Sequence, residues 1–489
     1  MSRNLTLLTD LYELTMMQGY YKTNNHKKVI FEVFYRKNPF GGGFAIACGL
    51  EQIIDYINNL KFSEDDISYL KSTGIFSDDF LDYLKCFRFT GDIYAIPEGT
   101  VIFPRVPLMK VVAPVDQAQL METALLNIIN HQSLIASKAA RVCFSAGETP
   151  VMEFGLRRAQ GPDSGIYGAR AAVIAGCVGT SNVLAGKMFD IPVMGTHAHS
   201  WIMSFNSEYE AFKAYSKLYP ENCTLLVDTY DTLQSGVPNA IRVFKEMQEE
   251  GIKLKSYGIR LDSGDLAYLT KRARAMLDEA GFAGAVISAS GDLDEFLIES
   301  LRQQSAAIGS WGVGTKMITA YDQPAFGGVY KIAAIEDENG NFQPKIKISE
   351  NTAKITDPGD KEIYRVYDEN EKIFADLITL RSETYDETEP LELFDPNETW
   401  KRTTLEPGKY RLRKLLVPVF EDGVCVYERK STRQIRDYCA KEKETLWDEV
   451  RRLINPHEVH VDLSEPLFNL RNEMLHKHSK NKIPDDIMM

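Results

Sequence analysis

The chain has 489 residues, of which 44% are hydrophobic and 26% are charged, a composition typical of a soluble globular protein. It is longer than one hydrophobic core usually supports, so two or three domains are expected. The net charge of −13 argues against a general nucleic-acid-binding surface, which needs a basic face, but it does not exclude a small basic pocket for a phosphorylated ligand.

The cysteines and the apolar segments indicate a reducing, aqueous compartment. Seven cysteines, an odd number with no CxxC spacing, exclude the pattern of a disulfide scaffold or a structural zinc site. The N-terminal residues lack the apolar run of a signal peptide, and no stretch approaches the roughly 18 continuous apolar residues of a membrane helix. We therefore expect a cytoplasmic protein with no membrane partner and no nucleic-acid partner.

The N-terminal part of the chain mixes aromatic-rich strands with amphipathic helices. Residues 29–35 read as a strand that ends at a glycine-rich break, and residues 50–60 have helical periodicity. Residues 90–115 hold short apolar runs between prolines and glycines, as short strands joined by turns would. These patterns predict an α+β N-terminal domain over residues 1–135.

From about residue 150 the pattern becomes regular, because each short apolar run ends in a polar or glycine-containing loop and is followed by a helical pattern. The apolar runs are residues 151–155, 191–194, 224–227, 257–261, 285–289 and 307–308. Alternating strands and helices predict βα units and a parallel sheet, whose active site lies at the carboxyl ends of the strands. We expect an α/β barrel or an open parallel sheet over residues 136–340.

After residue 340 the alternation stops and the chain becomes richer in Glu, Lys, Arg and Pro. A smaller C-terminal region is expected over residues 341–489, with strands at 345–348 and 415–420 and a helix near 435–453. Its composition indicates no function.

Two of the eight histidines lie in the segment Gly195-Thr196-His197-Ala198-His199, after an apolar run and before a helical pattern at residues 200–205. Because a helix N-terminus favours anions, a histidine here is well placed to meet phosphate. A capping histidine or a metal pair accounts for the residues equally well, although no DxD or ExxH motif lies near.

Two arginines occupy positions suited to a ligand. Arg157 follows the strand predicted at residues 151–155 and could hold phosphate, or it could form a solvated pair with Arg158. Arg260 lies within an otherwise apolar strand and needs a partner, because an unpaired buried charge is costly. Arg260 is expected either to form an internal salt bridge or to bind a ligand. Asp262 and Asp265, which follow it in the sequence, are suited to accept hydrogen bonds from sugar hydroxyls or to bind Mg²⁺.

Two glycine loops also follow predicted strands, at Ser290-Gly291-Asp292 and at residues 312–316. Backbone N–H groups in such loops can bind phosphate, but neither loop matches a Walker or dinucleotide fingerprint. Together with Arg157 they are typical of the phosphate end of a sugar-phosphate pocket. The segment 225–232 superficially resembles the phosphoribosyl pyrophosphate loop of type I phosphoribosyltransferases; however, Asp228 and Asp231 are separated by Tyr230, so that interpretation fails.

Six blocks of the sequence, in their order along the chain, closely resemble the nicotinate phosphoribosyltransferase family. The blocks are residues 8–16, 31–36, 153–158, 195–199, 258–265 and 314–315. The resemblance spans residues 5–335 closely and the remainder loosely. It implies a type II phosphoribosyltransferase fold, in which an α+β N-terminal domain packs on an irregular α/β barrel, and a homodimer with a shared active site.

The resemblance also implies the reaction and the roles of individual residues. Nicotinate and phosphoribosyl pyrophosphate would give nicotinate mononucleotide and pyrophosphate, the first step of NAD synthesis from nicotinate, with Mg²⁺ and coupled hydrolysis of ATP as co-substrate. His199, rather than His197, would be phosphorylated transiently by ATP. Tyr12 of the partner subunit would stack on the pyridine ring opposite Phe154. Arg157 would bind the ribose 5′-phosphate, Arg260 would lie near the pyridine and the ribose, and Asp262 would accept a hydrogen bond from a ribose hydroxyl. The remaining contacts to sugar and phosphate would come from Ser290, Gly291, Gly314 and Thr315. The resemblance assigns no Mg²⁺ ligands.

Thr180 and Ser181 bear on the choice of substrate. Related nicotinamide-using enzymes carry an aspartate at the position of Ser181, and a carboxylate there would repel nicotinate, whereas a hydroxyl can donate to it. This favours the acid over the amide, although hydroxyls are also common helix caps. The alternatives are a nicotinamide or quinolinate phosphoribosyltransferase and a barrel aldolase or isomerase. The second carboxylate of quinolinate would need an additional basic cluster, which we do not identify in the sequence. A barrel aldolase or isomerase would use a lysine at the end of a strand, whereas Lys316 follows a glycine loop.

Overall fold

The computed structural model describes residues 4–479, which form two compact units. Of the described residues, the mixed-sheet unit comprises 4–134, Ala325–Lys430 and 438–479, and the parallel-sheet unit comprises Ile135–Pro324 and Ser431–Asp437. No helix within residues 4–479 is long and apolar enough to cross a membrane.

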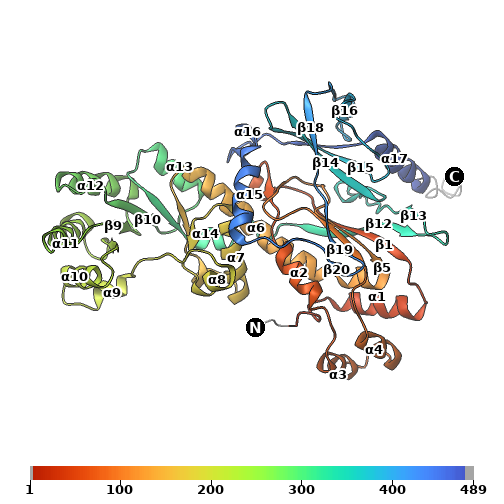
Figure 1. The fold of residues 1–489 in the computed structure, drawn as a ribbon, viewed down its shortest axis with the longest axis horizontal. Coiled ribbons are helices and arrows are strands. Elements are labelled where there is room, and N and C mark those ends of the chain that lie inside the picture. The colour runs from red at the N-terminus through yellow and green to blue at the C-terminus, as the bar shows by residue number, and fades with distance from the viewer. Residues whose placement is uncertain (1–3, 480–489) are drawn as a thin grey trace, which may run out of the picture. The chain divides into compact units, whose positions relative to one another are not determined.

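The parallel-sheet unit is built on six strands in the order β7-β6-β11-β10-β9-β8, and every neighbouring pair is parallel. The strands are β6 (Val151–Glu153), β7 (Gly179–Thr180), β8 (Asn222–Leu226), β9 (Ser256–Leu261), β10 (Val286–Ser290) and β11 (Ser310–Val313). The helices of this unit are α7 (Pro162–Ala175), α8 (Val183–Phe189), α9 (His199–Met203), α10 (Glu208–Leu218), α11 (Val237–Glu249), α12 (Leu266–Glu279), α13 (Glu295–Gln303) and α14 (Thr315–Ile318). The predicted alternation of strands and helices is confirmed, and Figure 1 shows it for β9 and β10 with α11 to α13.

The strand order explains why the barrel is irregular. β6, the first strand of the unit, pairs with β11, the last, as the first and last strands of a closed barrel do. β7 and β8 follow one another in the sequence but form the two edges of the sheet, so the barrel is open between them. The carboxyl ends of all six strands therefore lie at one edge of a curled sheet, where loops supply the polar side chains.

The prediction of a strand at residues 191–194 is wrong. Only an isolated bridge joins Val193 to Thr180, and Val193 and Met194 are exposed. An apolar run indicates a central strand only when it is buried, and Pro192 has no N–H for a sheet ladder. Residues 307–308, also predicted as a strand, precede β11 rather than belong to it.

The mixed-sheet unit contains a seven-stranded sheet in the order β13-β12-β1-β5-β3-β19-β20, all antiparallel. The strands are β1 (Lys28–Tyr35), β3 (Asp92–Ala95), β5 (Met109–Pro114), β12 (Gly328–Glu336), β13 (Phe342–Pro344), β19 (Val417–Glu421) and β20 (Val424–Cys425), and a separate pair is formed by β2 (Ala45–Ile46) and β4 (Val101–Ile102). The helices before residue 147 are α1 (Leu11–Lys22), α2 (Leu50–Asn58), α3 (Glu64–Ser72), α4 (Asp78–Lys85), α5 (Val115–Leu120) and α6 (Glu122–Ala146). The strands predicted at 29–35 and 415–420 and the helix at 50–60 are confirmed as β1, β19 and α2.

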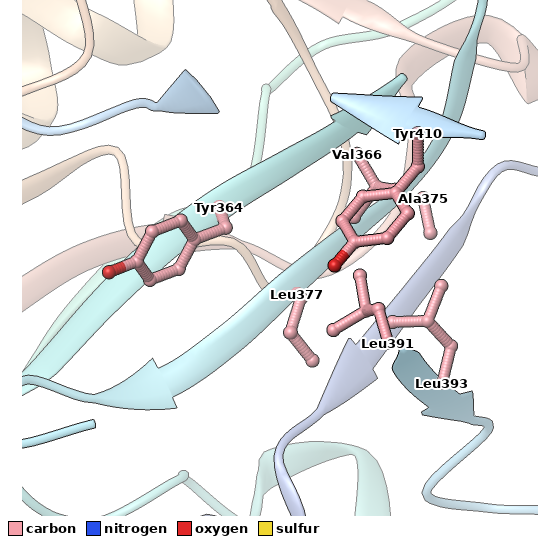
Figure 2. Packing of buried hydrophobic residues seen from close by; sticks show 7 residues of the cluster. All are labelled: Tyr364, Val366, Ala375, Leu377, Leu391, Leu393 and Tyr410. Atoms are coloured by element: carbon pink, nitrogen blue, oxygen red, sulfur yellow. The ribbon is translucent and has the colours of Figure 1, made fainter. Parts of the chain in front are cut away.

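A second sheet of the mixed-sheet unit has four strands in the order β18-β14-β15-β21 and lies beside a β16-β17 hairpin. The strands are β14 (Lys361–Asp368), β15 (Ile373–Leu380), β16 (Leu391–Phe394), β17 (Arg402–Leu405), β18 (Tyr410–Lys414) and β21 (His460–Leu463), and the helices are α15 (Thr432–Glu444), α16 (Asp448–Arg451) and α17 (Glu465–Ser479). Figure 2 shows the buried side chains that join the sheet to the hairpin: Tyr364, Val366, Ala375, Leu377, Leu391, Leu393 and Tyr410.

Two predictions for the C-terminal region are wrong in extent. Residues 345–348 form no strand: the Lys345 N–H still donates to the Ala333 carbonyl of β12, but the Lys347 N–H donates to Thr356 Oγ1 instead of to β12. The helix predicted near 435–453 is interrupted between α15 and α16, where Trp447 is extended and its indole N–H donates to the carbonyl of Ile373 at 3.0 Å. A tertiary contact, which helical periodicity does not report, sets this break.

Candidate active site

Arg260, on β9, is the centre of a hydrogen-bond network at the carboxyl edge of the parallel sheet. Its Nε donates to Ser290 Oγ at 2.8 Å, its Nη1 to Thr196 Oγ1 at 3.0 Å and its Nη2 to Asp262 Oδ1 at 2.8 Å. The guanidinium carbon lies 5.8 Å from the centre of the Phe154 ring. The internal salt bridge, one of the two alternatives for this arginine, is therefore present, and three bonds fix the plane of the cation.

Asp262 and Gly291 are held together by close packing of two strand-end loops. The Ser290 hydroxyl also donates to Asp262 Oδ1, and a Cβ on Gly291 would lie 2.1 Å from the Asp262 carbonyl oxygen. The φ of Gly291 is +93°, a conformation that residues with side chains rarely adopt. Only a glycine at position 291 therefore allows the two loops to lie this close together. Their close packing sets the position of Asp262 and of its carboxylate.

His199 is the first residue of α9, and two carboxylates face its ring. Its Nδ1 lies 3.1 Å from Thr229 Oγ1, while its Nε2 lies 3.9 Å from Asp228 Oδ1 and 4.0 Å from Asp262 Oδ2. The His199 side chain is 39% exposed, so the ring is open to a ligand. α9 has only five residues and ends at Met203, short of the helix expected to residue 205, so the neighbouring side chains rather than a helix dipole define the surroundings of the imidazole.

Asp228 was not predicted as a site residue, yet it connects His199 to the Arg260 network. Its Oδ2 accepts from the Asp262 backbone N–H at 2.8 Å and from Ser263 Oγ at 2.7 Å. Its Oδ1 is buried and has no hydrogen-bond partner among the described residues. A buried, partly unsatisfied carboxylate is an acceptor for a donor that a ligand brings to this site. The signal in the sequence for this role is the position of Asp228 at the end of the apolar run at residues 224–227, close behind β8.

His197 has different surroundings from His199. It is 8% exposed, its ring packs edge-on against Tyr215, and its Nε2 accepts from the Leu226 backbone N–H at 3.3 Å. Burial lowers the pKa of His197 to about 4, so the ring is neutral at physiological pH. These contacts are those of a structural side chain between α10 and β8.

Acid should therefore destabilise the protein in part through His197. Its pKa of about 4 in the folded chain lies below the ordinary value of 6.5, so the unfolded chain takes up the proton first. The stabilisation is complete above about pH 6.5 and is lost progressively as the pH falls towards 4. We expect His197→Gln to flatten the fall in free energy of unfolding over this range, as measured by urea denaturation at stepped pH. His199→Gln serves as the control, and an unchanged slope in His197→Gln would contradict this assignment.

The end of β6 gathers a second set of predicted residues. The buried Glu153 carboxylate accepts from the Gly155 backbone N–H and from Thr180 Oγ1, and burial raises its pKa. The Ser181 backbone N–H donates to the Glu153 carbonyl at 2.9 Å. Glu153, which was not singled out from the sequence, thus holds the loops that carry Phe154 and Ser181.

Ser181 is not the cap of the helix that follows it. The side chain of Asn182 accepts from the Ala185 backbone N–H at 3.1 Å and so caps α8. The Thr180 hydroxyl is bonded to Glu153, whereas the Ser181 hydroxyl has no hydrogen-bond partner within residues 4–479. The capping alternative for Ser181 is therefore wrong, and its hydroxyl is available to another group.

Phe154 and the arginines after it are arranged by glycines and a short turn. A Cβ on Gly312 would lie 2.6 Å from the Phe154 ring, so the absence of a side chain there makes room for the ring. Arg157 and Arg158 lie in a single turn (Leu156–Arg158) and both are exposed. Lys316 is paired with Asp294 at 2.6 Å, which counts against a free catalytic lysine.

The other loop residues fall where the sequence predicted. Ser290 is the last residue of β10, Gly314 lies between β11 and α14, and Thr315 is the first residue of α14, so both glycine loops are at the carboxyl edge of the sheet. Tyr12 belongs to the mixed-sheet unit, where it lies on α1 and is 46% exposed.

The candidate active site offers few protein ligands to a divalent cation in the absence of substrate. Within residues 4–479 no group of three His, Cys, Asp or Glu side chains could hold a metal ion. Mg²⁺ is commonly held by one or two carboxylates together with substrate phosphates and water. Asp228 and Asp262 fit that mode of binding better than a preformed metal cage.

Comparisons with known proteins agree over the length of the chain. Models of the nicotinate phosphoribosyltransferase N-terminal domain, family and C-terminal domain match residues 7–130, 149–374 and 360–471. Nicotinate phosphoribosyltransferase of Bacillus subtilis (strain 168) is 46% identical over 486 residues, which cover 99% of this chain and 98% of that protein. Nicotinate phosphoribosyltransferase 2 of Arabidopsis thaliana is 35% identical, with 95% and 93% covered.

The solved structures agree with the sequence comparisons. The crystal structure of human nicotinic acid phosphoribosyltransferase matches with a TM-score of 0.83 at 29% identity, over 96% of this chain and 99% of that one. A mixed α/β fold with a curled parallel sheet and a polar network at its carboxyl edge therefore defines this protein as a phosphoribosyltransferase of that fold. The chain belongs to the nicotinate phosphoribosyltransferase family.

Proposed function

We propose that this protein transfers the phosphoribosyl group of phosphoribosyl pyrophosphate to the ring nitrogen of nicotinate, giving nicotinate mononucleotide and pyrophosphate. The similarity over nearly the whole chain to enzymes named for this reaction carries the proposal. The test is to incubate the protein with both substrates, Mg²⁺ and ATP and to look for nicotinate mononucleotide by chromatography. Absence of that product would reject the proposal, and borohydride trapping with sugar phosphates would reveal an aldolase instead.

The side chains at the carboxyl edge of the sheet suit the two substrates. Phe154 offers one face to the pyridine ring, and Tyr12 of the partner subunit would cover the other. Asp262 is positioned by Arg260 to accept a ribose hydroxyl. Arg157 would bind the 5′-phosphate, and backbone amides at Gly291 and Gly314 with the hydroxyls of Ser290 and Thr315 would complete the sugar and phosphate contacts.

The transfer breaks the bond between ribose C1 and a pyrophosphate oxygen and forms a bond between C1 and the pyridine nitrogen. Positive charge builds on the ribose in the transition state, and the Asp262 carboxylate near the sugar would stabilise it. The fixed Arg260 plane and the Phe154 ring would align the attacking nitrogen. Bound Mg²⁺ would neutralise charge on the leaving pyrophosphate.

His199 is the residue we propose for coupling to ATP. Its Nδ1 is occupied by Thr229, which leaves Nε2 to attack the γ-phosphorus of ATP, with ADP leaving. Water then hydrolyses the phosphorus–nitrogen bond and releases phosphate. Asp228 and Asp262 would stabilise the positive charge that the ring carries once Nε2 has accepted the phosphoryl group.

A homodimer with a shared site is part of the proposal. α1 exposes large apolar side chains at Leu11, Tyr12 and Met16, with exposed fractions of 55%, 46% and 39%. An exposed apolar strip on one helix suits burial against a second copy.

A cytoplasmic location and a division of the chain into three regions, at residues 135 and 340, are also part of the proposal. The first and third of these regions belong mainly to one compact unit.

Arg157 and Arg158 provide a matched pair of variants. We expect Arg157→Ala to raise the KM for phosphoribosyl pyrophosphate about 10- to 100-fold, because a charged hydrogen bond to phosphate contributes about 1.5–3 kcal/mol. Arg158→Ala removes the same charge one residue later and should change the KM less than about threefold. Equal effects in steady-state kinetics would contradict the assignment of the 5′-phosphate to Arg157.

Ser181 tests the choice between acid and amide. We expect Ser181→Asp to lower kcat/KM for nicotinate by about 10- to 100-fold, because a carboxylate beside the substrate carboxylate is repulsive. Ser181→Ala removes the hydroxyl without adding charge and should lose no more than about tenfold. Competition between nicotinate and nicotinamide measures the shift, and an unchanged preference in Ser181→Asp would show that this position does not face the ring substituent.

A further inference from the structure

The mixed-sheet unit contains a cavity of about 710 Å³ that is lined by none of the residues of the candidate active site. Its walls come from β15, β16, β17 and β21 and from the chain around Trp447. This volume lies within the range of about 300–1,000 Å³ that is typical of small-molecule sites. The region has no role in the transfer reaction proposed above.

Part of the cavity wall is aromatic, and two of its rings, Phe394 and Trp447, are held in place by the protein itself. Phe374, Phe394, Trp400 and Trp447 all line it. The Trp447 indole N–H is bonded to the Ile373 carbonyl, and the Phe394 ring packs edge-on against Phe468 at 5.3 Å. Leu393, which also lines the cavity, belongs to the packed core shown in Figure 2. A preformed aromatic wall favours a flat ring.

One lining side chain is polar, buried and without a partner. Asp462 is 5% exposed, and its Oδ1 accepts no hydrogen bond from any described residue. Burial, together with the nearby Asp395, raises the pKa of Asp462 to about 6. A buried acceptor without a donor is unfavourable, so this carboxyl is best explained by a donor that the protein itself does not supply.

The cations near the cavity do not pair with Asp462. Arg402 is bonded to Glu392 at 2.6 Å, and Lys401 is paired with Glu398. Both are already neutralised, and the imidazoles of His457 and His460 share the wall with the carboxyl groups of Asp395, Glu449 and Asp462, so the cavity offers acceptors to a ligand rather than an excess of positive charge. Anionic ligands are therefore disfavoured, and so is a purely apolar ring, which would leave the carboxyl unpaired.

We propose that this cavity binds a flat heteroaromatic ring that carries an amino group, of the class found in aminopurine nucleosides. The ring would stack on the aromatic walls, and its amino N–H would donate to Asp462. The site is independent of the transfer reaction, so the two proposals can fail separately.

Adenosine and purine riboside are the probes, because they differ only in the 6-amino group. Trp400 and Trp447 are two of the four tryptophans of the chain, so binding is read from tryptophan fluorescence without reference to activity. We expect adenosine to quench the fluorescence and purine riboside to bind about 10- to 100-fold more weakly, as a lost hydrogen bond to a charged group implies. Equal binding of the two nucleosides, or no quenching, would overturn the proposal.

Three variants of the full-length protein locate the binding. Asp462→Leu should weaken adenosine binding about 10- to 100-fold with little effect on purine riboside. Trp400→Ala changes a side chain that is 76% exposed, so it should fold normally and weaken both nucleosides. Trp201→Phe alters a tryptophan of the parallel-sheet unit and should leave the quenching intact. Loss of quenching in Trp201→Phe, or unchanged affinity in both cavity variants, would exclude this site.

Discussion

Replacing His199 with alanine is expected to abolish the stimulation of phosphoribosyl transfer by ATP while a slower, ATP-independent transfer remains. The residues that would hold ribose and pyridine, Arg260 and Phe154, are untouched by the change, so binding and alignment of the transfer substrates persist. The nitrogen that lies between Asp228 and Asp262 is lost, so no phosphoryl group can be accepted there. The measurement is incorporation of label from γ-labelled ATP into protein, with pyrophosphate release measured with and without ATP.

His26→Ala is the matched control, because His26 is an exposed histidine of the mixed-sheet unit. It should retain both the phosphorylated protein and the stimulation by ATP. Label that persists in His199→Ala would show that another residue is phosphorylated. Complete loss of transfer in His199→Ala, with the fold intact, would show that the histidine acts in the transfer step itself.

Arg260→Lys is expected to lower kcat/KM for nicotinate by about 10²- to 10³-fold. The guanidinium makes three directed bonds, to Ser290, Thr196 and Asp262, and faces the Phe154 ring. A lysine keeps the charge but cannot reproduce a planar fork, so at least one of these groups loses its partner and Asp262 is no longer fixed. Steady-state kinetics with each substrate varied in turn would measure the effect.

Arg274→Lys separates a catalytic effect from a loss of packing. Arg274 belongs to the same unit and is also held by three groups, the Asp278 carboxylate and the carbonyls of Ala285 and Phe282. The lysine variant should lower the melting temperature yet keep kcat/KM within about threefold of the wild type. If Arg260→Lys lost no more activity than Arg274→Lys, the Arg260 network would have only a structural role.

The parallel sheet could be predicted from the sequence because its strands are buried on both faces and therefore appear as apolar runs with loops at regular intervals. The pairing of β6 with β11 could not, because it depends on how the sheet curls and not on local pattern. The apolar run at residues 191–194 is misleading for a related reason: three of its four side chains are exposed, and exposure is a tertiary property.

The candidate site was predictable where it depends on position along the chain. Asp262 follows the apolar run at residues 257–261 and Arg260 lies near the end of that run, which places both at the carboxyl edge of a parallel sheet. His199 follows the run at residues 191–194, which forms no strand, so its place at this edge could not be predicted in the same way. The partners of these residues were not predictable, because Thr196 lies 64 residues from Arg260 and Asp228 lies 34 residues from Asp262. The aromatic cavity around Asp462 left no sequence signal, since its walls come from segments spread over residues 373–462.

Pyrophosphate release with nicotinate and with nicotinamide, each with and without ATP, tests the central proposal most directly. We expect release with nicotinate to exceed release with nicotinamide by about tenfold or more, because the Ser181 hydroxyl can donate to a carboxylate and no carboxylate stands at that position. ATP should increase the release with nicotinate in the wild type and not in His199→Ala. Release that is as fast with nicotinamide as with nicotinate would contradict the proposed substrate.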